Sequence, residues 1–436
     1  MNKLNLASLA AACSAASLAA ACSAASPEPP KADVEIVKSS LARDTTPAVT
    51  PAELETFAAD QADFAIDLYQ AVRKGESGDV FLSPHSVSTA LAMTYAGARG
   101  ATQTEMKKAL RFSLDDAPLH RSFGYLDLAL ESRGKGAKGA DDQPFRLRIA
   151  NSIWGQKGTP FESAFLDTLA VSYGAGLNAV DFKTQPEPCR LAINAWVEDK
   201  TENRIKDLLP ERSLDPDTRF VIVNAVYFNA SWEKRFSKEG TRPSPFTKLD
   251  GSSVDVAMMH APMIQRPYLR GDGFEAVEMP YDGGETSLLV IAPDKGTFAT
   301  FESTLTGGKV LDVLAGLKSQ PVQLALPKAK LEVSFALNGP LESMGMKRAF
   351  EPGAADFTGI SRGESLSIKA VLHKTFLAID EKGTEAAAAT AVIGGTTSAP
   401  VDQPIVVNVD RPYLIAIVDR QTKTLLFVGR ILEPKS

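Results

Sequence analysis

The sequence predicts an α+β fold, in which helices and strands gather in different parts of the chain. Apolar residues recur at helical spacing in the first half. Short runs typical of strands dominate the second half, and the two kinds of segment do not alternate as in a doubly wound sheet. With 44% hydrophobic and 23% charged residues among 436, the chain is apolar enough to bury a large core.

The first predicted helix begins at a capping box. Thr50 and Glu53 stand three residues apart around Pro51, a pattern typical of helix N-termini. The apolar positions that follow at helical spacing are Phe57, Phe64, Ala65, Leu68 and Val72. We expect this helix to end before Gly75. A second helix is predicted over 86–96, and it should be buried because it is apolar on most sides.

Five later segments are predicted to be strands, because each is a short run of mostly aliphatic, β-branched or aromatic residues. They are 220–228, 287–291, 322–326, 413–418 and 425–428.

Composition excludes several classes of function. The net charge of -6 argues against a broad nucleic-acid-binding surface. Only three cysteines occur, two of them within the first 22 residues, which excludes a disulfide-stapled fold or a cysteine-rich zinc site. The four histidines lack a paired spacing, and no nucleotide-binding motif occurs. We expect no metal and no cofactor, and an enzyme is disfavoured.

One motif keeps an esterase as a minor alternative. Residues 359–363 match Gly-x-Ser-x-Gly, with Ser361 as the nucleophile. That motif requires a strand before the serine, a helix after it and a histidine much further along. Here a turn-like stretch precedes it, a strand-like stretch follows, and the last histidine is His373. We interpret the motif as a loop.

The N-terminal residues are typical of an export signal. Residues 1–21 carry a single charge, Lys3, and are mostly Leu, Ala and Ser. The run before Cys22 resembles a bacterial lipoprotein cleavage site, which predicts a signal peptide over 1–21 and a membrane-anchoring lipid on Cys22. Ordinary signal-peptidase cleavage is the alternative. We interpret 22–55 as a flexible tether and 56–436 as one domain, exported to the periplasm, cell surface or extracellular space.

The most unusual segment covers residues 381–400. Its alanine run favours a short helix or a linker. However, every second position from Thr384 to Val392 is small or apolar, and the charge of Glu385 falls on the opposite face. The same segment is therefore compatible with solvent exposure and with a central strand.

Six segments together resemble the serpin family, in the family's order over residues 56–435. They are 81–93 with 97–100; 224–228 with 232–236; 326–328; 341–346; the alanine segment; and 410–413 with 427–434. The resemblance implies a serpin fold with three β-sheets, eight or nine helices and an exposed reactive-centre loop.

The resemblance also implies an inhibitor rather than an enzyme. In serpins a serine or cysteine protease cleaves the exposed loop and becomes acylated, and the loop then inserts into the main sheet as a new strand. We therefore expect a monomeric, single-use pseudo-substrate that forms a covalent acyl complex with a target serine protease. A non-inhibitory serpin that acts as a binding or chaperone-like protein is the alternative.

The resemblance assigns the residues of this machinery. The hinge residues are Glu381, Gly383, Thr384, Glu385, Ala386, Ala387, Ala388 and Ala389. The residues of the family's shutter are Ser83, Ser86, Asn224 and His373, and the breach residue is Trp232. Gly383 is expected to act as a pivot, because glycine adopts backbone angles closed to other residues. The pair Gly394 and Gly395 should weaken the inserted strand slightly, since each glycine costs roughly 0.5–1 kcal/mol.

The scissile bond is placed by counting from the hinge. About 17 residues from Glu381 inclusive, the family's usual length, give the bond Thr397–Ser398. Counting back from 411–412 favours a position near Val401 instead. Thr or Val there fits elastase-like or subtilisin-like proteases, whereas trypsin-like enzymes require Arg or Lys.

Overall fold

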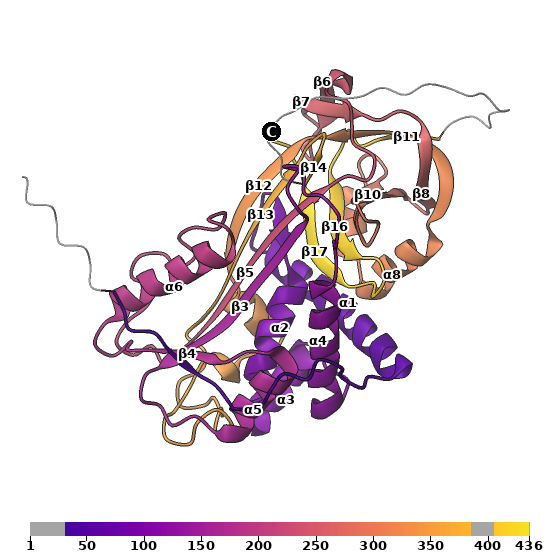
Figure 1. The fold of residues 1–436 in the computed structure, drawn as a ribbon. Helices are drawn as coiled ribbons and strands as arrows, with labels where there is room; N and C mark the ends of the chain where they lie inside the picture. Colours follow the sequence, from indigo (N-terminus) through magenta and orange to yellow (C-terminus); the bar gives the residue numbers. More distant parts are fainter. Residues whose placement is uncertain (1–30, 385–404, 436) are drawn as a thin grey trace, which may run out of the picture. The chain divides into compact units, whose positions relative to one another are not determined.

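Two β-sheets organise the computed structural model, which describes residues 31–384 and 405–435 (Figure 1). The seven-stranded sheet contains, in spatial order, β1 (Glu35–Val37), β4 (Leu177–Val180), β3 (Arg146–Gln156), β5 (Phe220–Ser231), β14 (Gly383–Thr384), β13 (Ala370–Ile379) and β12 (Ala329–Ala336). The ten-stranded sheet contains β2 (Val80–Leu82), β17 (Leu425–Ile431), β16 (Tyr413–Asp419), β10 (Thr286–Pro293), β9 (Phe274–Pro280), β8 (Ile264–Gly271), β11 (Lys318–Pro327), β7 (Ser253–His260) and β6 (Thr241–Thr247), with β15 (Ile405–Asn408) beside β11.

Nine α-helices occur within the described residues. They are α1 (Pro51–Arg73), α2 (Pro84–Tyr95), α3 (Gly100–Ala109), α4 (Asp116–Glu131), α5 (Ser163–Tyr173), α6 (Pro186–Lys200), α7 (Phe298–Ser303), α8 (Gly307–Gly316) and α9 (Asn338–Ser343). Two 3-10 turns cover Lys238–Gly240 and Arg348–Phe350. In this part of the chain no helix combines the length and apolar character that a membrane span requires. The predicted α+β class is confirmed.

The two predicted helices lie where the sequence places them. At the start of α1 the Glu53 amide donates to the Thr50 hydroxyl at 3.3 Å, and the Thr50 amide donates to the Glu53 carboxylate at 2.7 Å. All twelve residues of α2 are buried, because this helix packs against β3, β5 and β17. All five predicted strands are also present, as β5, β10, β11, β16 and β17.

Strand β5 separates two hydrophobic cores. Its side chains alternate between the faces of the sheet, as the geometry of a strand requires. Ile222 and Val226 join the larger core, which includes α1 and α2, whereas Val221 and Val223 join a smaller core. The smaller core is closed by α6, which lies against the sheet on the side away from α2 (Figure 1). Any strand added next to β5 therefore meets apolar surroundings on both faces.

The sheet count differs from the expected three. Strand β11 pairs with β8 over residues 318–322 and with β7 over residues 325–327. Because one strand belongs to both groups, two smaller sheets become continuous, and the described strands form two sheets.

Part of the segment expected to be an unstructured tether forms a strand. Residues 35–37, as β1, pair antiparallel with 177–179 of β4. This pairing covers the edge of the sheet, where exposed backbone groups would otherwise lack partners. Downstream of it, Arg43 forms an ion pair with Glu131 at 2.9 Å and a second with Asp127. Three residues in a polar segment give no periodicity from which such a strand is predicted.

Candidate functional site

The candidate site is the seam between β5 and β13 in the seven-stranded sheet. Over one part, which we call the closed end, residues 370–375 of β13 pair directly and in parallel with 221–226 of β5. At the other part, the open end, β14 lies between the two strands. It pairs antiparallel with residues 230–231 of β5, and Thr384 also pairs with Ile379 of β13. The seam thus already holds the first two residues of an added strand (Figure 1).

Gly383 is required at the open end by a close backbone approach. A Cβ atom on this residue would lie 2.1 Å from the carbonyl oxygen of Ala230 and 2.8 Å from the Cα of Ser231. Its φ is outside the left-handed region. The expected role as a pivot with unusual backbone angles is therefore not what the structure shows. Gly383 instead leaves room for β14 beside β5.

Thr384 is the first hinge side chain placed inside the sheet. It is 1% exposed, and its hydroxyl lies 2.6 Å from the hydroxyl of Tyr281. Burial raises the pKa of Tyr281, which keeps this phenol protonated. The Tyr281 ring stacks on the indole of Trp232, with centroids 4.6 Å apart. A small polar side chain at position 384 is thus both covered and hydrogen-bonded.

Trp232 holds the turn that leads into β14. Its indole Nε1 donates to the Asp380 carbonyl at 2.8 Å, and its backbone amide donates to the Lys382 carbonyl at 2.9 Å. Within the turn, the Asp380 carboxylate accepts from the amides of Lys382 and Gly383, at 2.8 and 3.2 Å. The tryptophan assigned to the breach therefore contacts the hinge directly.

Glu381 is fixed by two side chains, one from β6 and one from the residue that links β11 to β12. Its carboxylate forms an ion pair with Lys328 at 2.9 Å and accepts from the Thr241 hydroxyl at 2.8 Å. Burial opposes ionisation of Glu381, but the hydrogen bonds from Lys328 and Thr241 outweigh it and hold the pKa below its usual value. Glu381 is therefore anchored two residues before β14 begins.

At the closed end a buried polar network joins β5 to β13. The His373 Nε2 accepts from the Ser83 amide at 2.9 Å, so Nδ1 carries the proton and donates to the Asn224 side-chain oxygen. The Asn224 amide then donates to Ser86 and, at 2.6 Å, to Asn151. Burial lowers the pKa of His373 to about 3, which keeps the imidazole neutral. The four residues assigned to the shutter are brought together.

Sequence reasoning missed several partners in the site, among them Asn151 and Tyr281. Asn151 lies directly opposite Asn224 across the β3–β5 pair, and Tyr281 contacts both Trp232 and Thr384. The signal for Asn151 was a polar residue within an otherwise strand-like run; Tyr281 offered none. Other assigned residues lie outside the described part of the chain: Cys22, Glu385, Ala386, Ala387, Ala388, Ala389, Thr397, Ser398 and Val401.

The surroundings of Ser361 do not have the geometry of an esterase nucleophile. Ser361 is fully buried, and its hydroxyl accepts from the Gly363 amide at 3.2 Å. No helix follows it before β13 begins at Ala370, and in the described part of the chain no hydrogen bond joins it to a histidine. Nor do the described residues contain a cluster of His, Cys, Asp or Glu that could hold a metal ion.

Comparison with known proteins points to one family. The family model described as "Serpin (serine protease inhibitor)" matches residues 59–434. An uncharacterized serpin-like protein of Thermococcus kodakarensis is 41% identical over 374 residues, covering 85% of this chain and 84% of the relative. The leukocyte elastase inhibitor of Equus caballus is 34% identical over 392 residues, covering 87% of this chain and 100% of the relative.

Solved structures agree with the sequence comparison. The native state of tengpin, a thermophilic serpin, superposes with a TM-score of 0.80 at 29% identity, covering 92% of this chain and 100% of that structure. Human glycosylated kallistatin gives a TM-score of 0.75 at 28% identity, with coverage of 88% and 99%.

Proposed function

The chain belongs to the serpin family, and from this premise we propose that it is a suicide inhibitor of serine proteases. Serpins are protease inhibitors and not enzymes. The protein offers its reactive-centre loop as a pseudo-substrate. Cleavage leaves an acyl bond between the protease serine and the loop, and insertion of the loop next to β14 then carries the protease away before the bond is hydrolysed.

The placement of β14 carries this proposal. Thr384 and Gly383 already lie between β5 and β13, antiparallel to both. Continued insertion replaces the direct parallel pairing of β5 with β13 by two antiparallel ladders, which are slightly more stable per residue. The next residues of the chain, up to Thr390, contain nothing larger than threonine except Glu385. Small side chains favour fast insertion into a packed sheet.

The target class follows from the residue at the proposed scissile bond. Thr397–Ser398 presents a small side chain to the primary specificity pocket, as does the alternative near Val401. We therefore propose an elastase-like or subtilisin-like serine protease, with cysteine proteases as a secondary class. One relative is named a leukocyte elastase inhibitor, which supports this choice.

The decisive experiment mixes the protein with elastase and, separately, with subtilisin. We expect a complex that survives SDS, and mass spectrometry of the released peptide should place the cut after Thr397. A protease whose serine is blocked beforehand is the control and should form no such complex. Complete cleavage without any complex would contradict the proposal.

The non-inhibitory alternative keeps one observation in its favour. Gly394 and Gly395 fall in the later part of the inserting segment, where each costs roughly 0.5–1 kcal/mol in a strand. Thermal unfolding before and after loop cleavage separates the two functions. Inhibition requires a large rise in melting temperature on cleavage, whereas a binding or chaperone-like serpin gives no rise.

We also propose that the monomeric protein works outside the cytoplasm, tethered by a lipid on Cys22. The support is the order of residues over 1–22, in which a positive charge at Lys3 is followed by an apolar stretch and then by small residues before Cys22. Labelling of producing cells with a fatty acid should mark the protein, and Cys22→Ala should abolish the label. Export of an unlabelled wild-type protein would instead support ordinary signal-peptidase cleavage.

A further inference from the structure

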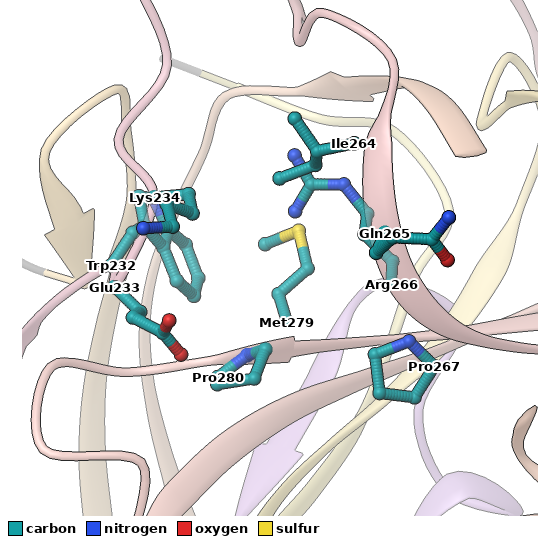
Figure 2. A pocket seen from close by; sticks show the side chains of 9 residues that line it. All are labelled: Trp232, Glu233, Lys234, Ile264, Gln265, Arg266, Pro267, Met279 and Pro280. Carbon is teal, nitrogen blue, oxygen red and sulfur yellow. The ribbon is translucent and has the colours of Figure 1, made fainter. Parts of the chain in front are cut away.

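A cavity beside the open end of the seam is lined by an arginine, Arg266, that has no partner among the described residues. The cavity has a volume of about 220 Å³ and lies between the residues that follow β5, the start of β8 and the end of β9. Figure 2 shows its main walls, which are formed by Trp232, Lys234, Ile264, Arg266, Met279 and Pro280.

The guanidinium group of Arg266 points from β8 toward Trp232 and lies beside the Met279 side chain (Figure 2). Arg266 is 5% exposed. Within the described part of the chain it makes no hydrogen bond or ion pair, and its Nε is buried without an acceptor. Glu233 also lines the cavity but forms no ion pair with Arg266.

Other buried arginines of this fold have carboxylate partners. Arg430 pairs with Glu302 at 3.1 Å, and Arg133 pairs with Asp419 at 2.7 Å. Burial lowers the pKa of Arg266 to about 10, so this guanidinium stays charged at neutral pH. A buried charge without a partner destabilises a fold. A bound anion would supply the missing counter-charge for Arg266.

We propose that this cavity binds a small organic monocarboxylate, whose carboxylate pairs with Arg266 and whose apolar body lies against Ile264, Met279 and Trp232. The planar guanidinium fork matches a carboxylate in two parallel hydrogen bonds. The apolar walls exclude water from this pair and favour a hydrophobic ligand body. Glu233 and Lys234 in the same cavity carry opposite charges that offset each other, which leaves the single charge of Arg266 to match a monoanion rather than a dianion such as phosphate.

Isothermal titration of the intact, uncleaved protein with benzoate tests the site. We expect one binding site per chain and an affinity at least tenfold lower in Arg266→Met. This variant should fold, because it removes an unpaired buried charge and keeps an apolar stem. Arg270→Met is the matched control: Arg270 lies on the same strand, its side chain is 51% exposed, and it pairs with Asp294 at 2.8 Å. Its benzoate affinity should equal that of the wild type.

A second variant leaves the charge in place. Ile264→Phe fills the cavity while keeping Arg266, and it should also lose benzoate binding. The proposal is overturned if wild-type protein does not bind benzoate, or if Arg266→Met and Ile264→Phe bind it as the wild type does. Binding of inorganic phosphate as tight as that of benzoate would overturn the ligand class. None of these outcomes depends on protease inhibition.

Discussion

The two ends of the β5–β13 seam use the same pair of strands but hold them in different ways. At the open end a third strand separates them, and Gly383 leaves the space that this strand occupies. At the closed end a side-chain bond from His373 to Asn224 joins them directly. In the proposed mechanism, insertion therefore starts where the sheet has space for an added strand, and it has to break a buried hydrogen bond to proceed.

A charged side chain at the open end should cause the largest loss of inhibition. Thr384→Arg places a cation at a position that is 1% exposed, where the native side chain bonds to the Tyr281 hydroxyl and no carboxylate partner occurs among the described residues. The hinge is then excluded from the sheet, and the protein should become a substrate. We expect at least a tenfold loss of SDS-resistant complex, quantified on gels. Thr384→Ser, which keeps the hydroxyl, should inhibit normally; equal loss in both variants would mean that the side chain's charge is irrelevant.

Removal of the hydrogen bond between His373 and Asn224 at the closed end should make it easier for β5 and β13 to separate. His373→Ala leaves the Ser83 amide and the Asn224 oxygen without partners in a buried site. We expect a loss of about 3 kcal/mol in unfolding free energy, together with polymers or prematurely inserted protein. His120, which is also buried but contacts Tyr173 away from the seam, provides the control. His120→Ala should lower stability without polymers, as followed by native gel electrophoresis; polymers in both variants would contradict a role specific to the seam.

A methyl group added at Gly383 tests whether the open end needs the space that this glycine leaves beside β5. Gly383→Ala puts a Cβ atom against the backbone of Ala230 and should destabilise the protein by about 2 kcal/mol. Gly339→Ala is the matched control, since a Cβ there meets nothing within 4 Å. It should be neutral or slightly stabilising in chemical denaturation. Equal stability of the two variants would show that β14 is not tightly held beside β5.

The smallest expected effect is a pH dependence of the unfolding free energy, caused by His373 at the closed end. His373 has a pKa of about 3 in the folded protein, whereas an unfolded histidine titrates near 6.5. The unfolded chain therefore takes up a proton below pH 6.5 that the folded protein does not. This stabilising contribution is complete at pH values well above 6.5, and it falls by about 1 kcal/mol between pH 6.5 and pH 5.5. The unfolding free energy of the wild type and of His373→Ala should be measured at pH 6.5 and at pH 5.5. The decrease between the two pH values should be smaller in the variant by about 1 kcal/mol.

Local sequence patterns predicted much of the fold. The capping box and helical spacing placed α1, and the apolar run placed a buried α2. Runs of strand-forming residues placed β5, β10, β11, β16 and β17. These patterns suffice because helix caps and strand alternation depend on neighbours within a few residues of each other.

The site required more than local patterns. The resemblance to serpins named His373 and Asn224 as partners, but they are 149 residues apart, and Ser83 is 290 residues from His373. No spacing rule brings such residues together. Asn151 joined this network only because β3 and β5 pair in a register that places it opposite Asn224.

The sequence by itself determined the fold class, the family and the small residues of the hinge. Only the tertiary structure decided that Gly383 is needed for space rather than for backbone freedom, that residues 35–37 pair with β4, and that Arg266 is buried with no partner in the described part of the chain. The physical reason is that local conformation follows from adjacent residues, whereas close approach, strand pairing and the desolvation of a charge depend on which distant segments meet.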